Sequence, residues 1–190
     1  TPDMGIVLSD GCRLSARVWM PEDATKTPVP AILEYIPYRK RDGTLPRDEM
    51  MHPYFAGHGY AAVRVDMRGC GESEGTPGHV LCTDQVEDVR NAISYLAQRP
   101  EVMADRIALS GTSFGGAVVL YTAGVDTRVA AVISAGGWGN GERKLEGQHP
   151  TPGAWDKFKR MLQEGRDQKA KTGTTMMVHR FDIVPIPPHL

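Results

Sequence analysis

The sequence predicts a three-layer α/β domain with a mostly parallel sheet. Short apolar segments alternate with segments of helical length, and this order implies parallel strands joined by right-handed crossovers. Residues 60–65 are mostly apolar on both faces, as expected of a strand inside a parallel sheet. With 190 residues, 41% hydrophobic and 24% charged, the chain is long enough for one domain with a real core.

The first half of the chain predicts four strands and one helix. We expect strands at Met4–Leu8 and Arg13–Met20, which can pair antiparallel at one edge of the sheet. A short apolar strand is expected at Ala31–Tyr35, a helix around Asp48–Ala56, and a buried strand at Tyr60–Val65.

The second half continues the alternation. Apolar residues recur at spacings of three and four through Thr83–Gln98, which predicts an amphipathic helix. We expect a strand at Arg106–Ser110, a helix at Phe114–Ala123 and a strand at Val129–Ser134. A charged helix at Ala154–Lys169 follows, flanked by proline-rich sequence.

Composition excludes several classes of partner. The net charge is −1 without a long run of one sign, so no nucleic-acid or membrane partner is expected. No apolar stretch reaches the length of a membrane span, and no signal peptide is visible, although the chain begins with Thr1 rather than Met. Cys12, Cys70 and Cys82 lack metal-ligand spacing and are odd in number, which favours free thiols in the cytoplasm over a disulfide.

Two segments match the pattern G-x-S-x-G, in which the serine can be a nucleophile: GESEG at Gly71–Gly75 and GTSFG at Gly111–Gly115. A nucleophile elbow needs a buried strand before the serine, a helix directly after it, and small flanking residues. GTSFG has all three, whereas GESEG is followed by TPG and carries two glutamates that would oppose an oxyanion. The sequence therefore predicts Ser113 as the nucleophile and Ser73 as a loop serine.

Four segments carry a resemblance to a known family: GCRLSARVWMPED, ILEYIPYRKRDG, YAAVRVDMRGCGESEG and RIALSGTSFGG. Their order looks like the α/β-hydrolase superfamily, and PYRK together with DMRGCGESEG is most similar to the cocaine esterase and X-Pro dipeptidyl-peptidase (CocE/NonD-type) group. The match runs from about Gly5 to Gly136. It implies an α/β-hydrolase fold and a serine hydrolase activity that needs no cofactor and no metal.

The resemblance also implies roles for individual residues. Ser113 is the expected nucleophile, and the backbone N–H of Phe114 and the hydroxyl of Tyr38 are the expected oxyanion donors. The alternative for Tyr38 is a loop tyrosine that packs on the sheet edge. Asp66 and Arg68 resemble the structural turn of the superfamily, and we expect them to form a fixed ion pair with an architectural role.

The general acid and base are missing from the expected positions. In this fold the order is serine, then a carboxylate, then histidine. Asp126 follows Ser113 but lies just before a strand, at the opposite sheet edge, and is read as a surface cap. Among the six histidines, three precede Ser113 and fit no group position, and three lie in the tail: His52, His58 and His79; His149, His179 and His189. His149 or His179 would be the base only in an unusual arrangement.

We therefore expect residues 1–137 to be the N-terminal part of an α/β-hydrolase core without its last strands, and residues 138–190 to begin a cap. Trp138, Trp155, Phe158 and Met161 are candidate cap-core or pocket residues. A C-terminal segment beyond residue 190, in the same protein or as a separate chain, is expected to supply the acid and histidine, since roughly two more βα units are needed.

The predicted function is cleavage of a small-molecule carboxylic ester, or an amide, through an acyl-enzyme on Ser113. An X-Pro-type peptidase or an acyltransferase would use the same site. A catalytically silent domain that binds a ligand or partner is a further alternative. The sequence is also compatible with a homo-oligomer.

Overall fold

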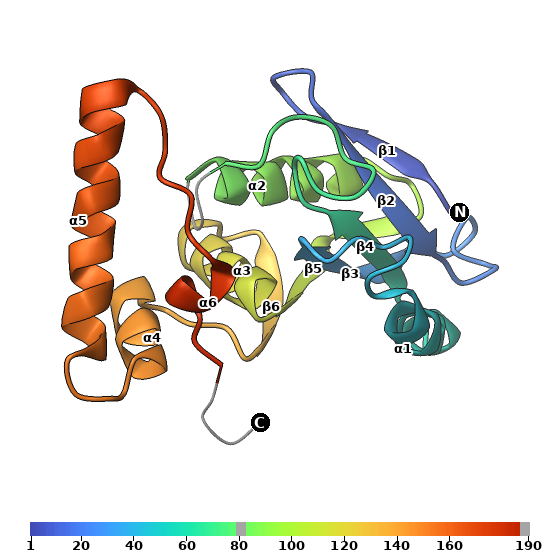
Figure 1. Cartoon of the computed structure of the whole chain (residues 1–190). Coiled ribbons are helices and arrows are strands. Elements are labelled where there is room, and N and C mark those ends of the chain that lie inside the picture. The colour runs from blue at the N-terminus through green and yellow to red at the C-terminus, as the bar shows by residue number, and fades with distance from the viewer. Residues whose placement is uncertain (79–82, 187–190) are drawn as a thin grey trace. The chain divides into compact units, whose positions relative to one another are not determined.

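The computed structural model describes residues 1–78 and 83–186 and divides into two compact units, Thr1–Gly139 and Asn140–Leu190 (Figure 1). In its described residues, the first unit contains six strands and three helices: β1 (Met4–Val7), β2 (Arg13–Trp19), β3 (Val29–Ile36), α1 (Leu45–Gly57), β4 (Ala61–Asp66), α2 (Thr83–Ala97), β5 (Val102–Thr112), α3 (Phe114–Val125) and β6 (Val129–Ala135).

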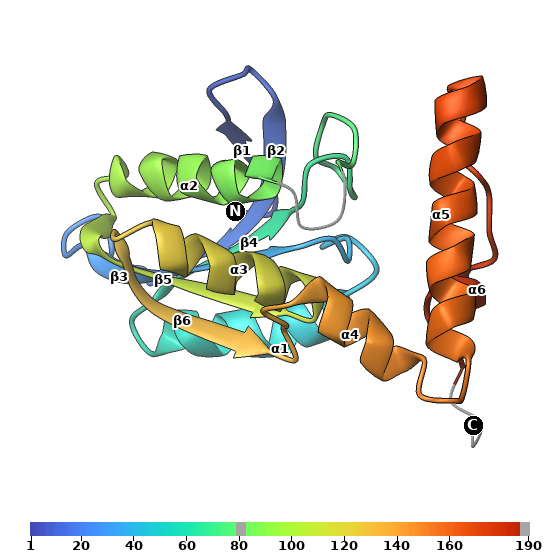
Figure 2. The ribbon, with the colours of Figure 1, turned by 90° about the vertical axis from the view of Figure 1, so that its left-hand side faces the viewer.

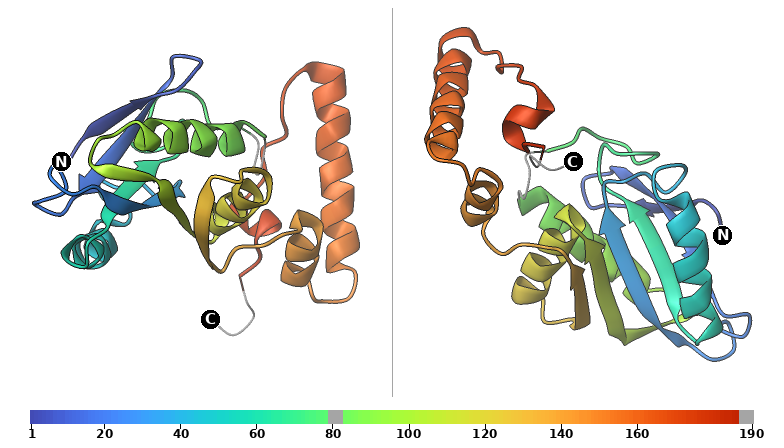
Figure 3. Two further views of the ribbon diagram at one scale, coloured as in Figure 1. Left: turned by 180° about the vertical axis from the view of Figure 1, so that it is seen from behind. Right: turned by 60° about the horizontal axis from the view of Figure 1, so that its bottom comes forward.

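The strands form one sheet in the order β1-β2-β4-β3-β5-β6. β1 and β2 pair antiparallel, as does β2 with β4, and the other three pairings are parallel. Figure 3 shows the β1–β2 pair at one side of the sheet and β6 at the other. The predicted α/β class and the antiparallel edge are both confirmed.

The helices cover both faces of the sheet. Figure 2 shows α2 and α3 on one face and α1 on the other. The predicted apolar stripe of α2 is buried, with Val89 and Ile93 at 0% exposure, because it packs on the sheet. The sheet and these helices form the three layers of an α/β domain.

Most element boundaries differ slightly from the prediction, and the starts of β5 and α1 are among the larger differences. β5 begins at Val102 rather than Arg106. Residues 104–106 are exposed, so this early part of the strand lacks the apolar pattern that marks a buried strand. α1 begins at Leu45 rather than Asp48, since a proline is tolerated in the first helical turn.

The second unit contains α4 (Gly141–Gln148), α5 (Ala154–Thr172) and α6 (Arg180–Ile183), of which only α5 was predicted. Phe158 is 3% exposed, and its ring lies 5.6 Å from Trp155 and 4.5 Å from His149. Among the tail residues singled out in the sequence, Trp155 and Phe158 therefore pack within this unit. In the described residues, every helix is too short or too polar to cross a bilayer.

Candidate active site

Ser113 is the single residue between the end of β5 and the start of α3. Its backbone has φ 54° and ψ −113°, a strained conformation for a residue with a side chain. The Ser113 N–H donates to the Ala135 carbonyl at 2.8 Å, which fixes the turn to the end of β6. This strand, strained serine and helix form the arrangement that a nucleophile elbow requires.

Glycines allow the close approach of strand and helix at this turn. A methyl group on Gly115 would lie 2.6 Å from the Tyr35 carbonyl oxygen and would collide with the Ile36 side chain. A methyl group on Gly116 would lie 2.9 Å from Ser134 Oγ. The first turn of α3 therefore rests directly on the ends of β3 and β6. The small residues around Ser113 predicted a close approach of strand and helix, but not which strands are contacted.

Phe114 is the first residue of α3, so its backbone N–H has no carbonyl acceptor within the helix. The positive end of the helix dipole lies at the same point. The Phe114 ring is half-buried and lies 6.2 Å from the ring of Trp138. Two aromatic side chains thus stand beside the turn that carries Ser113.

Tyr38 lies two residues beyond the end of β3 and is 37% exposed. β3 and β5 are parallel neighbours, with Glu34 opposite Ser110, so Tyr38 and Ser113 follow adjacent strands at the same sheet edge. No hydrogen bond joins the side chains of Tyr38 and Ser113. Within the described part of the chain, the Tyr38 hydroxyl has no hydrogen-bond partner.

The second serine motif has a different setting. Ser73 lies in a loop, where its hydroxyl donates to the Asp66 carbonyl at 2.6 Å and accepts from the Ser15 N–H at 2.9 Å. Both hydrogen-bonding roles of the hydroxyl are therefore used in tying the loop to β2 and β4. Ser73 is a loop serine, as predicted.

The predicted ion pair between Asp66 and Arg68 is wrong. Asp66 is fully buried and pairs with Arg64 at 3.2 Å. Arg68 instead binds Asp88 on α2 at 2.6 Å and Asp10 at 2.8 Å. Arg64 and Asp66 are two residues apart in β4, so their side chains lie on the same face and can pair. Arg68 lies in the turn after the strand, where this alternation no longer applies, and it pairs with carboxylates from distant parts of the chain. The architectural role of both residues agrees with these contacts.

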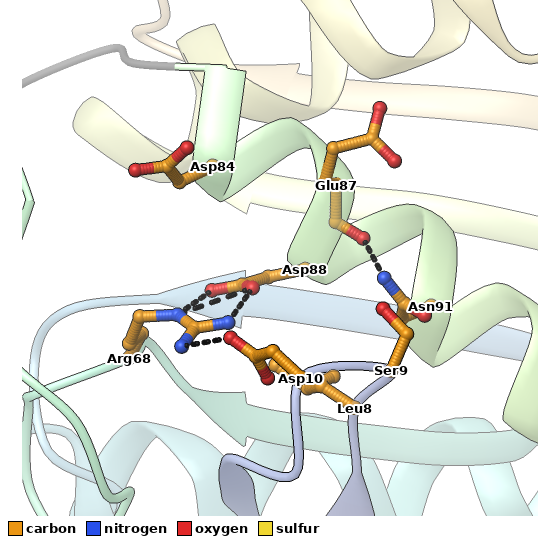
Figure 4. Close-up of a pocket in the computed structure, with 8 residues that line it drawn as sticks. All are labelled: Leu8, Ser9, Asp10, Arg68, Asp84, Glu87, Asp88 and Asn91. Atoms are coloured by element: carbon orange, nitrogen blue, oxygen red, sulfur yellow. Dashed lines mark hydrogen bonds and ion pairs between the residues drawn. The ribbon is translucent and has the colours of Figure 1, made fainter.

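A cavity of about 340 Å³ lies around this Arg68 cluster and is shown in Figure 4. It is lined by Leu8, Ser9, Asp10, Arg68, Asp84, Glu87, Asp88 and Asn91. The hydrogen bonds that Arg68 donates to Asp88 and Asp10 raise the pKa of its guanidinium, so its charge is fixed. None of the predicted site residues lines this cavity.

Asp126, read from the sequence as a surface cap, is 5% exposed. Arg128 binds it at 2.6 Å and Arg90 at 3.3 Å, and these hydrogen bonds lower the pKa of its carboxyl. Its backbone ends α3, so the capping position is right and the surface location is wrong. The Asp126 carboxylate therefore binds two guanidinium groups, that of Arg90 on α2 and that of Arg128 directly before β6.

A buried cluster between α1 and the sheet was not predicted. Glu34, Asp48 and His52 are each at most 1% exposed and bring their oxygen and nitrogen atoms within 4.8 Å of one another. Two guanidinium groups already fill this cluster. Arg47 binds Glu34 and Asp48 at 2.6 Å, and Arg64 lies 3.3 Å from Asp48. These residues do not fit a metal ion, since it would be repelled by both arginines.

Arg47, which binds two carboxylates of this cluster, also contacts the residue directly before Ser113. Arg47 Nη1 lies 3.4 Å from the hydroxyl of Thr112, the residue directly before Ser113. The sequence did contain a signal for this cluster. Glu34 and Arg64 are oppositely charged residues in otherwise apolar strands, and they lie opposite each other in the pairing of β3 with β4.

No histidine of the described first unit is placed beside Ser113. His52 contacts Glu34 at 3.2 Å, and His58 follows α1 at the amino-terminal edge of the sheet, before β4 begins. In the second unit, His149 contacts the Leu145 carbonyl and His179 caps α6. His79, His189 and Cys82 lie outside the described residues, and Cys12 and Cys70 are free thiols.

Several curated proteins resemble the chain over part of its length. The quorum-quenching protein AidA of Acinetobacter baumannii (strain MDR-ZJ06) is 44% identical over 81 residues, which are 42% of this chain and 27% of that protein. The polyketide transferase claH of Penicillium crustosum is 34% identical over 128 residues, or 67% of this chain and 41% of that protein.

Among solved structures, the α/β hydrolase GrgF from Penicillium sp. sh18 superposes with a TM-score of 0.66 at 25% identity, covering 96% of this chain and 60% of that one. The chain therefore spans less than two thirds of the length of each protein named here. The family model described as X-Pro dipeptidyl-peptidase (S15 family) matches residues 10–177. With the six-stranded fold and the strained serine turn, this match shows that the chain belongs to the X-Pro dipeptidyl-peptidase (S15) family within the α/β hydrolases.

Proposed function

We propose that this chain carries the nucleophile and oxyanion site of a serine hydrolase that cleaves a small carboxylic ester or an amide. The observation that carries the proposal is the backbone of Ser113, with φ 54° between a buried strand and the first turn of a helix. A non-glycine residue adopts this conformation only where the surroundings enforce it, and such strain is concentrated at functional sites. Membership of a hydrolase family supports the same conclusion.

In the proposed reaction, Ser113 Oγ attacks the carbonyl carbon while a histidine accepts the hydroxyl proton. The oxyanion accepts hydrogen bonds from the Phe114 N–H and the Tyr38 hydroxyl. The histidine then donates its proton to the leaving alcohol or amine, and an acyl-enzyme remains. Water attacks the acyl-enzyme in the second half of the reaction and releases the acid. None of these steps calls for a cofactor.

The histidine and its carboxylate partner are proposed to come from a C-terminal segment beyond residue 190. Support comes from β6, which pairs with β5 on one side and has Ile133 51% exposed. On the neighbouring α3, Tyr121 is 63% exposed and Val125 52% exposed. Further strands and helices beside β6 would bury these apolar side chains and would bring the remaining triad members to the carboxyl edge of the sheet.

A second candidate function is acyl transfer to an acceptor other than water. Several relatives bear the names polyketide transferase or acyltransferase, including claH and the drtE protein of Aspergillus calidoustus. The same acyl-enzyme serves both reactions, and the second unit is proposed to be the start of a cap that selects the acceptor. An X-Pro peptidase, as the family description suggests, would form the acyl-enzyme from a Xaa-Pro amide.

The test is intact-mass spectrometry of the full-length protein before and after a fluorophosphonate probe. We expect one adduct on the wild type, none on Ser113→Ala, and one on Ser73→Ala, which is the matched control from the other motif. Labelling that persists in Ser113→Ala contradicts the assignment. Binding of a ligand without any labelling of the wild type identifies a catalytically silent domain.

A substrate panel then separates the three reactions. Short-chain p-nitrophenyl esters, Xaa-Pro p-nitroanilides, and esters with added alcohol or amine acceptors are compared with the same enzyme. Ester hydrolysis unaffected by acceptors supports the esterase. A product that contains the acceptor supports the acyltransferase, and preferential release of nitroaniline supports the peptidase.

A further inference from the structure

We propose that Glu72, in the serine motif that is not the elbow (Gly71–Gly75), positions the oxyanion donor Tyr38 through Lys40. In this proposal Glu72 and Lys40 are positioning residues that act through the loop on which Tyr38 stands. The inference rests on the proposed function, because it assigns a role toward the Tyr38 hydroxyl.

The first observation is a pairing between the two loops. Lys40 lies two residues after Tyr38, and its side chain is only 1% exposed. Its ammonium group pairs with the Glu72 carboxylate, to which Arg41 also binds at 3.3 Å. A buried ammonium group without a partner is strongly unfavourable, so the loop carrying Lys40 stays where Glu72 can reach it.

The second observation is that both loops share one buried carboxylate. The Lys40 N–H donates to Asp66 Oδ1 at 2.8 Å, and the Glu72 N–H donates to Asp66 Oδ2 at 3.3 Å. Gly71 has no side chain where a methyl group would collide with this carboxylate, and its φ of 57° favours glycine. The two loops are therefore held at fixed spacing by backbone as well as side-chain contacts.

The third observation is that the Tyr38 loop is tightly turned. The Gly43 N–H donates to the Arg39 carbonyl at 3.0 Å, and Gly43 packs against the Tyr38 backbone so closely that a methyl group would collide with it. Arg39 itself has φ 50°. A loop closed in this way transmits a shift at Lys40 to the adjacent Tyr38 rather than absorbing it.

The Lys40–Glu72 pair affects the proposed oxyanion site in two ways, through the position of Tyr38 and through the local charge. An oxyanion donor must lie about 2.7–3.1 Å from the developing charge, so a small displacement of Tyr38 weakens catalysis. Glu72 would by itself oppose a negative charge at this sheet edge, and the ammonium of Lys40 balances it. The Lys40 contact also lowers the pKa of the Glu72 carboxyl, which keeps this carboxyl ionised at neutral pH.

The test is a double-mutant cycle in the full-length protein, with p-nitrophenyl acetate as the substrate. Tyr38→Phe is expected to lower kcat by about 10²–10³-fold. Glu72→Ala is expected to lower kcat by about 10- to 100-fold with KM unchanged, as a misplaced catalytic group does. In the Tyr38→Phe background, Glu72→Ala is expected to have less than about a twofold effect, because the donor it positions is already absent.

Three further variants keep the test decisive. Lys40→Met reports on the same pair from the other loop, and Glu72→Gln retains an acceptor for Lys40 and is expected to recover part of kcat. Glu74→Gln is the matched control, because Glu74 lies in the same motif but its carboxylate accepts from the Arg13 backbone at 3.1 Å. It is expected to leave kcat unchanged.

The outcomes separate this proposal from the proposed function. If Tyr38→Phe lowers kcat but the Glu72 and Lys40 variants do not, or if their effects persist in the Tyr38→Phe background, the positioning role is wrong and the serine mechanism stands. If Tyr38→Phe itself has no effect, both the donor role and the positioning role are overturned. Labelling of Ser113→Ala by the fluorophosphonate overturns the mechanism as a whole.

Discussion

The backbone N–H of Ser113 donates a hydrogen bond of 2.8 Å to the carbonyl oxygen of Ala135. This bond joins the residue after β5 to the last residue of β6, so the strained turn is fixed from the side of the sheet that β6 forms. The opposite side of the turn is fixed by contact of Gly115 with Tyr35 and Ile36 of β3. The conformation of Ser113 therefore depends on both neighbouring strands.

This packing predicts that Gly115→Ala disrupts the elbow. The added methyl group would collide with Ile36, and overpacking of this kind costs about 1–3 kcal/mol of unfolding free energy. We expect a lower midpoint in urea and slower fluorophosphonate labelling of Ser113. Gly124→Ala is the matched control in the same helix, because a methyl group there meets nothing within 4 Å. Equal stability of the two variants would contradict the packing argument.

The strands and helices of the first unit, and the elbow, could be predicted because their signals are local. Apolar spacing in α2 and β4, and the small residues around Ser113, are visible within windows of about a dozen residues. The partners of charged residues could not be predicted in this way. Arg68 binds Asp88 and Asp10, which are 20 and 58 residues away, whereas the sequence suggested its neighbour Asp66.

The error about Asp126 has the same origin. A carboxylate between a helix and a strand is typical of the surface, and only the fold brings Arg90 of α2 over it. The buried cluster of Glu34, Asp48 and His52 likewise depends on α1 packing against β3 and β4. In contrast, the role of Tyr38 rests on the resemblance and on its strand-end position, and it stays a prediction.

The contacts of Arg68 predict a large effect of removing it. Arg68→Leu would leave the Asp88 carboxylate, 2% exposed, with only the Tyr35 hydroxyl at 3.0 Å as a described partner. A buried charge that loses its partner costs about 3 kcal/mol or more, so we expect a clear loss of stability in urea unfolding. Asp10→Asn, which alters the exposed side of the same arginine, is expected to change stability little. A similar loss in both variants would show that the buried pair is not the cause.

The lowered pKa of the Asp126 carboxyl predicts a pH-dependent contribution to stability. Because the pKa is lower in the folded state than its unfolded value of about 3.9, the stabilisation is fully present above that pH and is lost as pH falls toward the folded pKa. We expect Asp126→Asn to lower the unfolding free energy at pH 7 by about 2 kcal/mol.

The difference between wild type and Asp126→Asn should shrink as the pH of the urea titration is lowered below about 4. The control is Asp156→Asn, whose carboxylate pairs with Lys159 at an exposed site on α5 and should matter little at either pH. A wild-type advantage that is constant from pH 7 to pH 3 would show that the effect of Asp126 is not electrostatic.

The proposed pairing of a further segment with β6 predicts that two exposed apolar residues differ in how well they tolerate substitution by lysine. Ile133 on β6 is 51% exposed and Met50 on α1 is 74% exposed. If both face solvent in the complete protein, lysine at either position should leave the stability unchanged. The proposal that a further segment pairs with β6 requires Ile133 to become buried, because added strands and helices cover the sheet edge. We therefore expect Ile133→Lys in the full-length protein to lower soluble yield and stability severely, since a lysine ammonium would be placed in an apolar interior. Met50→Lys should fold and unfold as the wild type does in the same urea titration. If both lysine variants are equally stable, β6 faces solvent, and the acid and histidine that complete the site must be sought elsewhere than beside this strand.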